Sequence, residues 1–182
     1  MYAIVSLLDP VHTAEVTALW QELEATFGLR GIYATPYPHF SYHVAEQYND
    51  ALITELEEIA RTTAPFTVET SGLGLFTGPF PILFIQVVRS APLNALHQAL
   101  WPHLTRHAQK PVAYYRPASW VPHITLAHSD LTVGNLPEII AHLCARRFNW
   151  QLPIDNLTLV CEHCGSHDLH SRLALSGIPE VE

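Results

Sequence analysis

One stretch of the sequence, VPHITLAH at residues 121–128, has an earlier counterpart in PHFSYHVA at residues 38–45. In both, a Pro-His pair is followed by an apolar or aromatic residue, a hydroxyl residue and a second apolar or aromatic residue. Both are typical of β-strands, because polar side chains alternate with bulky apolar ones. A pattern that recurs about 80 residues further along the chain predicts that a larger unit of structure has been duplicated.

The sequence around each stretch follows the same order of predicted elements. An apolar strand, an amphipathic helix and a loop lead to the Pro-His strand, and a helix and a strand follow it. The expected elements are a strand at 2–8, a helix at 11–27, strand 40–45, a helix at 52–59 and strand 66–76, then strand 82–88, a helix at 93–104 interrupted or kinked near Pro102, strand 123–128, a helix at 136–147, strand 148–154 and a hairpin of 157–160 with 169–175. We therefore predict a single bilobal domain over residues 1–182, with one repeat at about 1–80 and the other at about 81–182.

Strand geometry places the histidine and the hydroxyl residue of each stretch on one face, because alternate residues share a face. His39 then lies beside Ser41, and His123 beside Thr125. If the duplication brings the two strands face to face, one neutral imidazole can accept a proton from an attacking oxygen while the other protonates the leaving oxygen. The hydroxyls can bind non-bridging phosphate oxygens. One such pair is commonplace in a chain with 12 histidines, so it is the second copy that favours a catalytic site.

At these residues the sequence resembles the 2H phosphoesterase superfamily, and within it the 2'-5' RNA ligase-like (LigT-like) proteins. The resemblance covers nearly the whole chain. It implies an α+β fold of two duplicated units whose antiparallel sheets line a central cleft. It also implies a metal-independent phosphodiesterase without a cofactor, acting on 2',3'-cyclic phosphates or 2'-5' linked nucleotide or RNA ends. His39 and His123 are then the general acid and base, in an order left open, and Ser41 and Thr125 hold the phosphate.

The loops that precede the two Pro-His pairs contain candidates for substrate contact. Tyr115, Arg116 and Trp120 lie in the second loop, and Tyr37 lies in the first. Aromatic rings can stack on a base, and a guanidinium can hold a phosphate. The alternative for these loops is a surface segment that packs its own aromatic side chains.

Strand parity separates two further histidines. His43 has the parity of His39 and is expected to line the cleft or support its residues. His128 has the parity opposite to His123, which predicts a structural or exposed position.

The segment CEHCGSHDLH, residues 161–170, contains thiols and imidazoles that could bind zinc. Its spacing matches no familiar zinc finger, and the duplication places it where FTGPFP, residues 76–81, forms a turn between strands. We therefore expect no metal, and keep a metal-binding protein organised on this cluster as the weakest alternative.

Composition limits the partners. The chain carries a net charge of −8 with only nine Lys and Arg, which argues against a groove for long nucleic acid and disfavours true 2'-5' RNA ligation on a large RNA. A small nucleotide or an RNA terminus is the expected ligand. Three cysteines and the lack of any long apolar run predict a cytoplasmic protein without disulfides or a membrane segment, and we expect a monomer. The main alternative is a module that binds nucleotides or RNA ends without catalysis.

Overall fold

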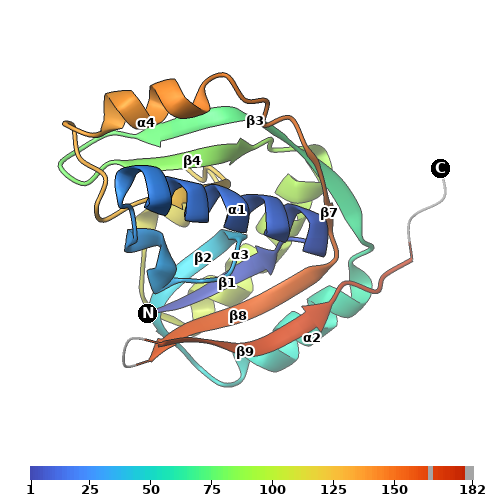
Figure 1. The fold of residues 1–182 in the computed structure, drawn as a ribbon. Helices are drawn as coiled ribbons and strands as arrows, with labels where there is room; N and C mark the ends of the chain where they lie inside the picture. Colours follow the sequence, from blue (N-terminus) through green and yellow to red (C-terminus); the bar gives the residue numbers. More distant parts are fainter. Residues whose placement is uncertain (164–165, 179–182) are drawn as a thin grey trace.

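The computed structural model describes residues 1–163 and 166–178, of which residues 162, 163 and 166–170 are described by their backbone alone. Over this part the chain forms an α+β fold with two antiparallel sheets and four α-helices (Figure 1). This confirms the predicted fold class.

The first sheet has the order β5-β2-β1-β8-β9, and the second has the order β6-β4-β3-β7. The strands of the first sheet are β1 (Tyr2–Leu7), β2 (His39–Tyr48), β5 (Ala108–Pro111), β8 (Asn156–His163) and β9 (Ser166–Ala174). Those of the second are β3 (Phe66–Phe76), β4 (Ile82–Val87), β6 (His123–Ala127) and β7 (Gln151–Ile154). One Pro-His strand, β2, therefore belongs to the first sheet, and the other, β6, belongs to the second.

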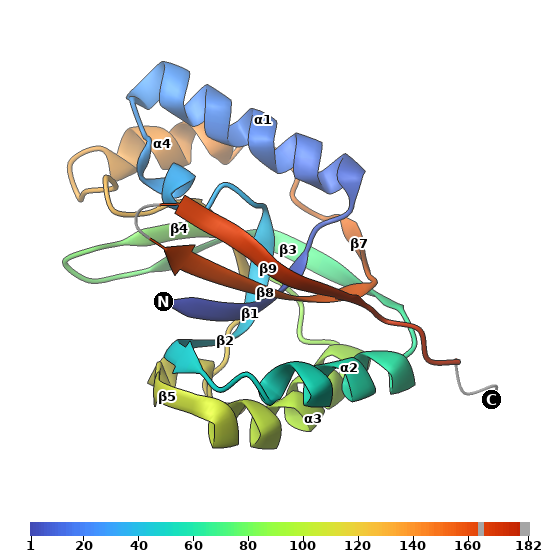
Figure 2. The ribbon, with the colours of Figure 1, turned by 90° about the horizontal axis from the view of Figure 1, so that it is seen from below.

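The four helices form two pairs on opposite sides of the strands (Figure 2). They are α1 (Pro10–Phe27), α2 (Leu52–Thr62), α3 (Ala91–His107) and α4 (Leu136–Leu143). Between α1 and α4, Glu22 accepts hydrogen bonds from His142 and Arg146. Between α2 and α3, Glu55 pairs with His103 at 2.6 Å. Each pair is thus held by a carboxylate on one helix and basic side chains on or just beyond the other.

Local sequence sets the beginnings of the two long helices. Asp9 accepts from the backbone N–H groups of Val11 and His12 and so caps α1, with Pro10 in its first turn. The Ser90 hydroxyl accepts from the N–H of Leu93 at the start of α3. Both caps follow directly on a buried strand, so each strand turns into its helix within two or three residues.

The structure differs from the expected elements at two helices and two strands: β5 was not expected, and the strand expected at 148–154 begins at Gln151. Helix α3 is not interrupted at Pro102, because buried Leu100 and Leu104 on either side anchor it to the core while Pro102 faces solvent. Helix α4 ends at Leu143, earlier than expected, because the N–H of Arg146 bonds back to the Leu143 carbonyl in a tight turn. The division into two repeats near residue 80 stays a prediction. None of the described helices has the length and apolar character needed to cross a membrane.

Candidate active site

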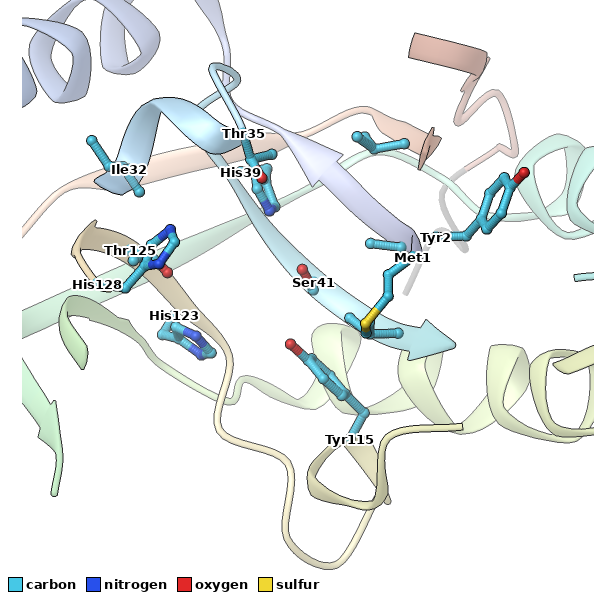
Figure 3. Close-up of a pocket in the computed structure, with 13 residues that line it drawn as sticks. Met1, Tyr2, Ile32, Thr35, His39, Ser41, Tyr115, His123, Thr125 and His128 are labelled. Atoms are coloured by element: carbon cyan, nitrogen blue, oxygen red, sulfur yellow. The ribbon is translucent and has the colours of Figure 1, made fainter. Parts of the chain in front are cut away.

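The two Pro-His strands bring their polar residues to one cavity. His39 and Ser41 from β2, and His123 and Thr125 from β6, line a cavity of about 250 Å³ between the two sheets (Figure 3). The residue after each histidine, Phe40 on β2 and Ile124 on β6, is buried in the core. The alternation expected from the sequence therefore holds over these first positions, and the four polar residues converge.

A backbone hydrogen bond fixes each of the two imidazoles. The Nδ1 of His39 lies 2.5 Å from the Tyr37 carbonyl oxygen, and the Nδ1 of His123 lies 2.7 Å from that of Val121. A carbonyl can only accept, so in both rings Nδ1 carries the proton. The second nitrogen, Nε2, is then the atom of each ring that can exchange a proton with a ligand.

The residues before each histidine have the same hydrogen-bond arrangement in both strands. Pro38 and Pro122 have no N–H, and their carbonyls accept from Leu8 and Val87, which lie at the ends of the neighbouring strands. The carbonyl one residue earlier turns instead toward the imidazole. At both Pro-His pairs, the proline carbonyl thus bonds the neighbouring strand while the carbonyl before it bonds the imidazole.

Both strands carry a β-bulge at the same place. The register of β2 against β1 jumps from Ser41 to His43, and that of β6 against β4 jumps from Thr125 to Ala127. Bulges re-aim side chains and recur near active sites. Two indole groups bond to the carbonyls at these bulges: Trp120 Nε1 donates to the Ser41 oxygen at 2.9 Å, and Trp20 Nε1 to the Thr125 oxygen at 3.1 Å.

The bulges reverse strand parity for the residues that follow them. His43 is fully buried on the core side, so the expectation that it shares a face with His39 is wrong. Val44 takes its place in the cavity wall. Directly after β6, His128 lines the cavity, so the parity argument that placed it on the face opposite to His123 is wrong (Figure 3). Sequence parity missed His128 because an extra residue in a strand gives no signal of its own.

His43 belongs to a buried aromatic cluster behind the site. Its Nδ1 lies 2.5 Å from the Tyr48 hydroxyl, and its ring packs against Trp101. Burial and the neighbouring His97 lower the pKa of His43 to about 4, and burial lowers the pKa of His97 to about 4. Both rings are therefore neutral near pH 7 and act as packing groups.

The loop residues divide between the cavity and its surroundings. Tyr115 lines the cavity, and burial raises the pKa of its phenol, so it stays protonated. Trp120 is buried and stacked on His97, with ring centroids 3.9 Å apart, and it does not line the cavity. Arg116 also lies outside the wall. Tyr37 contributes its carbonyl to His39 rather than a ring to the cavity.

His123 sits against two aromatic rings on the second sheet. Phe76 meets it edge-on with ring centroids 4.9 Å apart, and Phe84 lies 5.0 Å away. Burial lowers the pKa of His123, although its bond to the Val121 carbonyl acts in the opposite direction. A Cβ atom at Gly74 would lie 2.2 Å from the Phe84 ring. Only glycine therefore lets Phe84 occupy its place beside His123.

The loop that precedes the first Pro-His pair packs against the residues that follow β6. The Asp130 carboxylate accepts from the N–H groups of Arg30 and Gly31, at 2.5 and 2.7 Å. A Cβ at Gly31 would lie 2.2 Å from the His128 carbonyl oxygen, so the two backbones touch. This contact places Ile32 and Thr35 in the cavity wall.

The residues considered for a metal lie mostly beyond the described side chains. Cys161 is buried at the end of β8. Cys164 falls outside the described residues, as do the side chains of His163, His167 and His170. Elsewhere in the part of the chain that the structure describes, no group of three or more His, Cys, Asp or Glu could hold a metal ion.

Comparison with known proteins places the chain in a family. The profile of the 2'-5' RNA ligase superfamily matches residues 9–163, and the chain belongs to this superfamily. A Bacillus mycoides protein named "Putative phosphoesterase" is 26% identical over 132 residues, which is 70% of this chain and 72% of that protein. This confirms the resemblance found in the sequence.

Solved structures share the fold. The protein TT0787 of Thermus thermophilus has a TM-score of 0.70 at 17% identity, over 97% of this chain and 98% of that chain. Escherichia coli LigT complexed with ATP has a TM-score of 0.55 at 16% identity, over 96% and 97%. At these identities the likeness concerns the arrangement of helices and strands.

Proposed function

We propose that the protein is a phosphodiesterase that cleaves 2',3'-cyclic phosphates or 2'-5' linkages on a nucleotide or at an RNA end, with two histidines as general acid and base. The observation that carries this proposal is the convergence of His39 and His123 on one cavity, each with Nδ1 tied to a backbone carbonyl. Membership of the superfamily and the phosphoesterase name of a relative support the same chemistry.

In hydrolysis of a cyclic phosphate, the neutral imidazole takes a proton from water as the water oxygen forms its bond to phosphorus. The bond from phosphorus to the 2' or 3' oxygen breaks, and the other imidazole, as imidazolium, donates a proton to that oxygen. The two rings end with exchanged protonation and reset through solvent. Burial lowers the pKa of His123, which favours its neutral form, the form that a general base needs.

The hydroxyls of Ser41 and Thr125 face the same space and can donate to the non-bridging oxygens, where negative charge builds up. The bulges and the two indole N–H groups hold the backbone at these residues. Each hydroxyl is therefore positioned before the ligand arrives, which is the condition for stabilising a transition state by fixed dipoles.

The test is turnover of the four 2',3'-cyclic nucleoside monophosphates with EDTA present, resolving the 2'-phosphate from the 3'-phosphate product. We expect hydrolysis by the wild type and a loss of at least about 100-fold in His39→Gln and His123→Gln. His12→Gln, a change of the same kind outside the cavity wall, is the matched control. Equal turnover by wild type and both variants refutes the proposal, and binding without turnover by the wild type favours the non-catalytic module.

A further inference from the structure

His128 gives the cavity a third imidazole that the two sequence motifs do not contain. It lines the same wall as Thr125 and lies near His123 (Figure 3). Its Nδ1 lies 2.6 Å from the Ser129 hydroxyl. On the other Pro-His strand, β2, the residue that corresponds to His128 is Val44, which does not titrate. The additional titratable group therefore lies on the β6 side of the cavity.

The cavity offers little permanent positive charge to a phosphate. Its lining residues, all within the described part of the chain, include no Lys, Arg, Asp or Glu. Arg116 lies outside the wall, and Arg30, on the segment packed against His128, is engaged with Glu24. The α-amino group belongs to Met1, which lies toward the end of the cavity opposite His128 (Figure 3). Charge on a ligand near His128 must therefore be balanced chiefly by imidazolium groups.

The groups around His128 act on it in opposite directions. Burial lowers its pKa, and the carboxylate of Asp130 raises it, with burial the stronger effect. His39, His123 and Tyr115 line the same cavity, and the Tyr115 phenol is protonated. With one of the two imidazoles, His39 or His123, protonated and His128 neutral, the site has one positive charge fewer than is needed to balance a dianion.

We propose that His128 makes the cavity discriminate by ligand charge. A phosphodiester, which carries one negative charge, binds with His128 neutral, whereas a doubly charged phosphomonoester binds tightly only when His128 takes up a proton. As the pH rises and His128 loses its proton, the site then favours the diester substrate and releases the monoester product. This inference rests on the proposed function, because it assumes that the phosphorus sits between the two Pro-His strands.

Two inert anions test the inference without turnover. Sulfate stays doubly charged from about pH 6 to 8, and dimethyl phosphate stays singly charged, so changes in their affinity report titration of the protein. We expect the sulfate dissociation constant of the wild type to rise with pH about tenfold per unit more steeply than that of His128→Gln, which is the signature of one proton taken up on binding. For dimethyl phosphate the two proteins should show equal slopes.

A second variant tests the same inference by adding a permanent positive charge at this position. His128→Arg supplies a permanent charge and should tighten sulfate binding at about pH 8 by at least about tenfold, with product inhibition increased in parallel. Parallel sulfate slopes in wild type and His128→Gln overturn the role of His128 while leaving the phosphate site intact. Sulfate binding at no pH, or sulfate that does not compete with dimethyl phosphate, overturns the phosphate site and this inference with it.

Discussion

The bond from Trp120 to the Ser41 carbonyl predicts a measurable link between a buried indole and the phosphate site. Trp120→Phe removes an N–H donor at 2.9 Å from a carbonyl at the bulge of β2. An unsatisfied buried carbonyl costs about 1–3 kcal/mol. The smaller ring also leaves a gap beside His97, where Trp120 now stacks at 3.9 Å, and this adds about 1 kcal/mol. We expect the free energy of unfolding to fall by about 2–4 kcal/mol.

The same substitution should weaken ligand binding through Ser41. Urea denaturation gives the stability, and the dissociation constant of dimethyl phosphate gives the state of the site, which we expect to weaken by at least about fivefold. Replacing Trp120 with benzothienylalanine keeps the shape and removes only the N–H, so it separates the hydrogen bond from packing. Trp101→Phe is the control, because Trp101 packs on His43 and His97 rather than donating to Ser41. If the benzothienyl protein binds the anion as the wild type does, the carbonyl bond has no role in positioning Ser41.

Three further predictions concern the surroundings of the site. Gly74→Ala should displace Phe84 and with it the ring of His123, lowering kcat by about tenfold or more in a protein that stays folded by circular dichroism; an unchanged kcat contradicts this. The folded pKa values of His43 and His97 are lowered to about 4, so the unfolded chain binds more protons than the folded chain below about pH 6.5. The free energy of unfolding should therefore fall by roughly 1 kcal/mol per pH unit for each group between about pH 6.5 and 4. Urea midpoints that are equal at about pH 7 and 5 refute this prediction. Tyr115→Phe removes a phenol from the cavity wall and should raise KM more than it lowers kcat, whereas an effect on kcat alone assigns Tyr115 a part in the chemical step.

Sequence alone was sufficient for the polar residues at the start of each Pro-His strand. Alternation, together with the predicted duplication, indicated that His39, Ser41, His123 and Thr125 lie around one cavity, and it holds there because those positions precede the bulges. The class of fold followed from the order of the elements and from the resemblance to the superfamily.

The residues after the bulges could not be placed in this way. An extra residue in a strand inverts every later side chain, so His43 was expected in the cleft and His128 outside it. Trp120 was expected to contact substrate because aromatic side chains in a loop suit stacking. Its actual contacts, with His97 and the Ser41 carbonyl, depend on packing between distant segments that no local pattern encodes.

The central claim, that two imidazoles act as acid and base on one phosphate, is tested most directly by changing the leaving group. The measurement compares wild type, His39→Gln and His123→Gln on the methyl and 4-nitrophenyl phosphodiesters of one nucleoside, since nitrophenolate leaves without a proton. We predict that one variant recovers most of its rate on the nitrophenyl ester, which identifies the missing acid, while the other stays inactive on both. Equal defects of both variants on both esters, or no defect at all, contradict the claim.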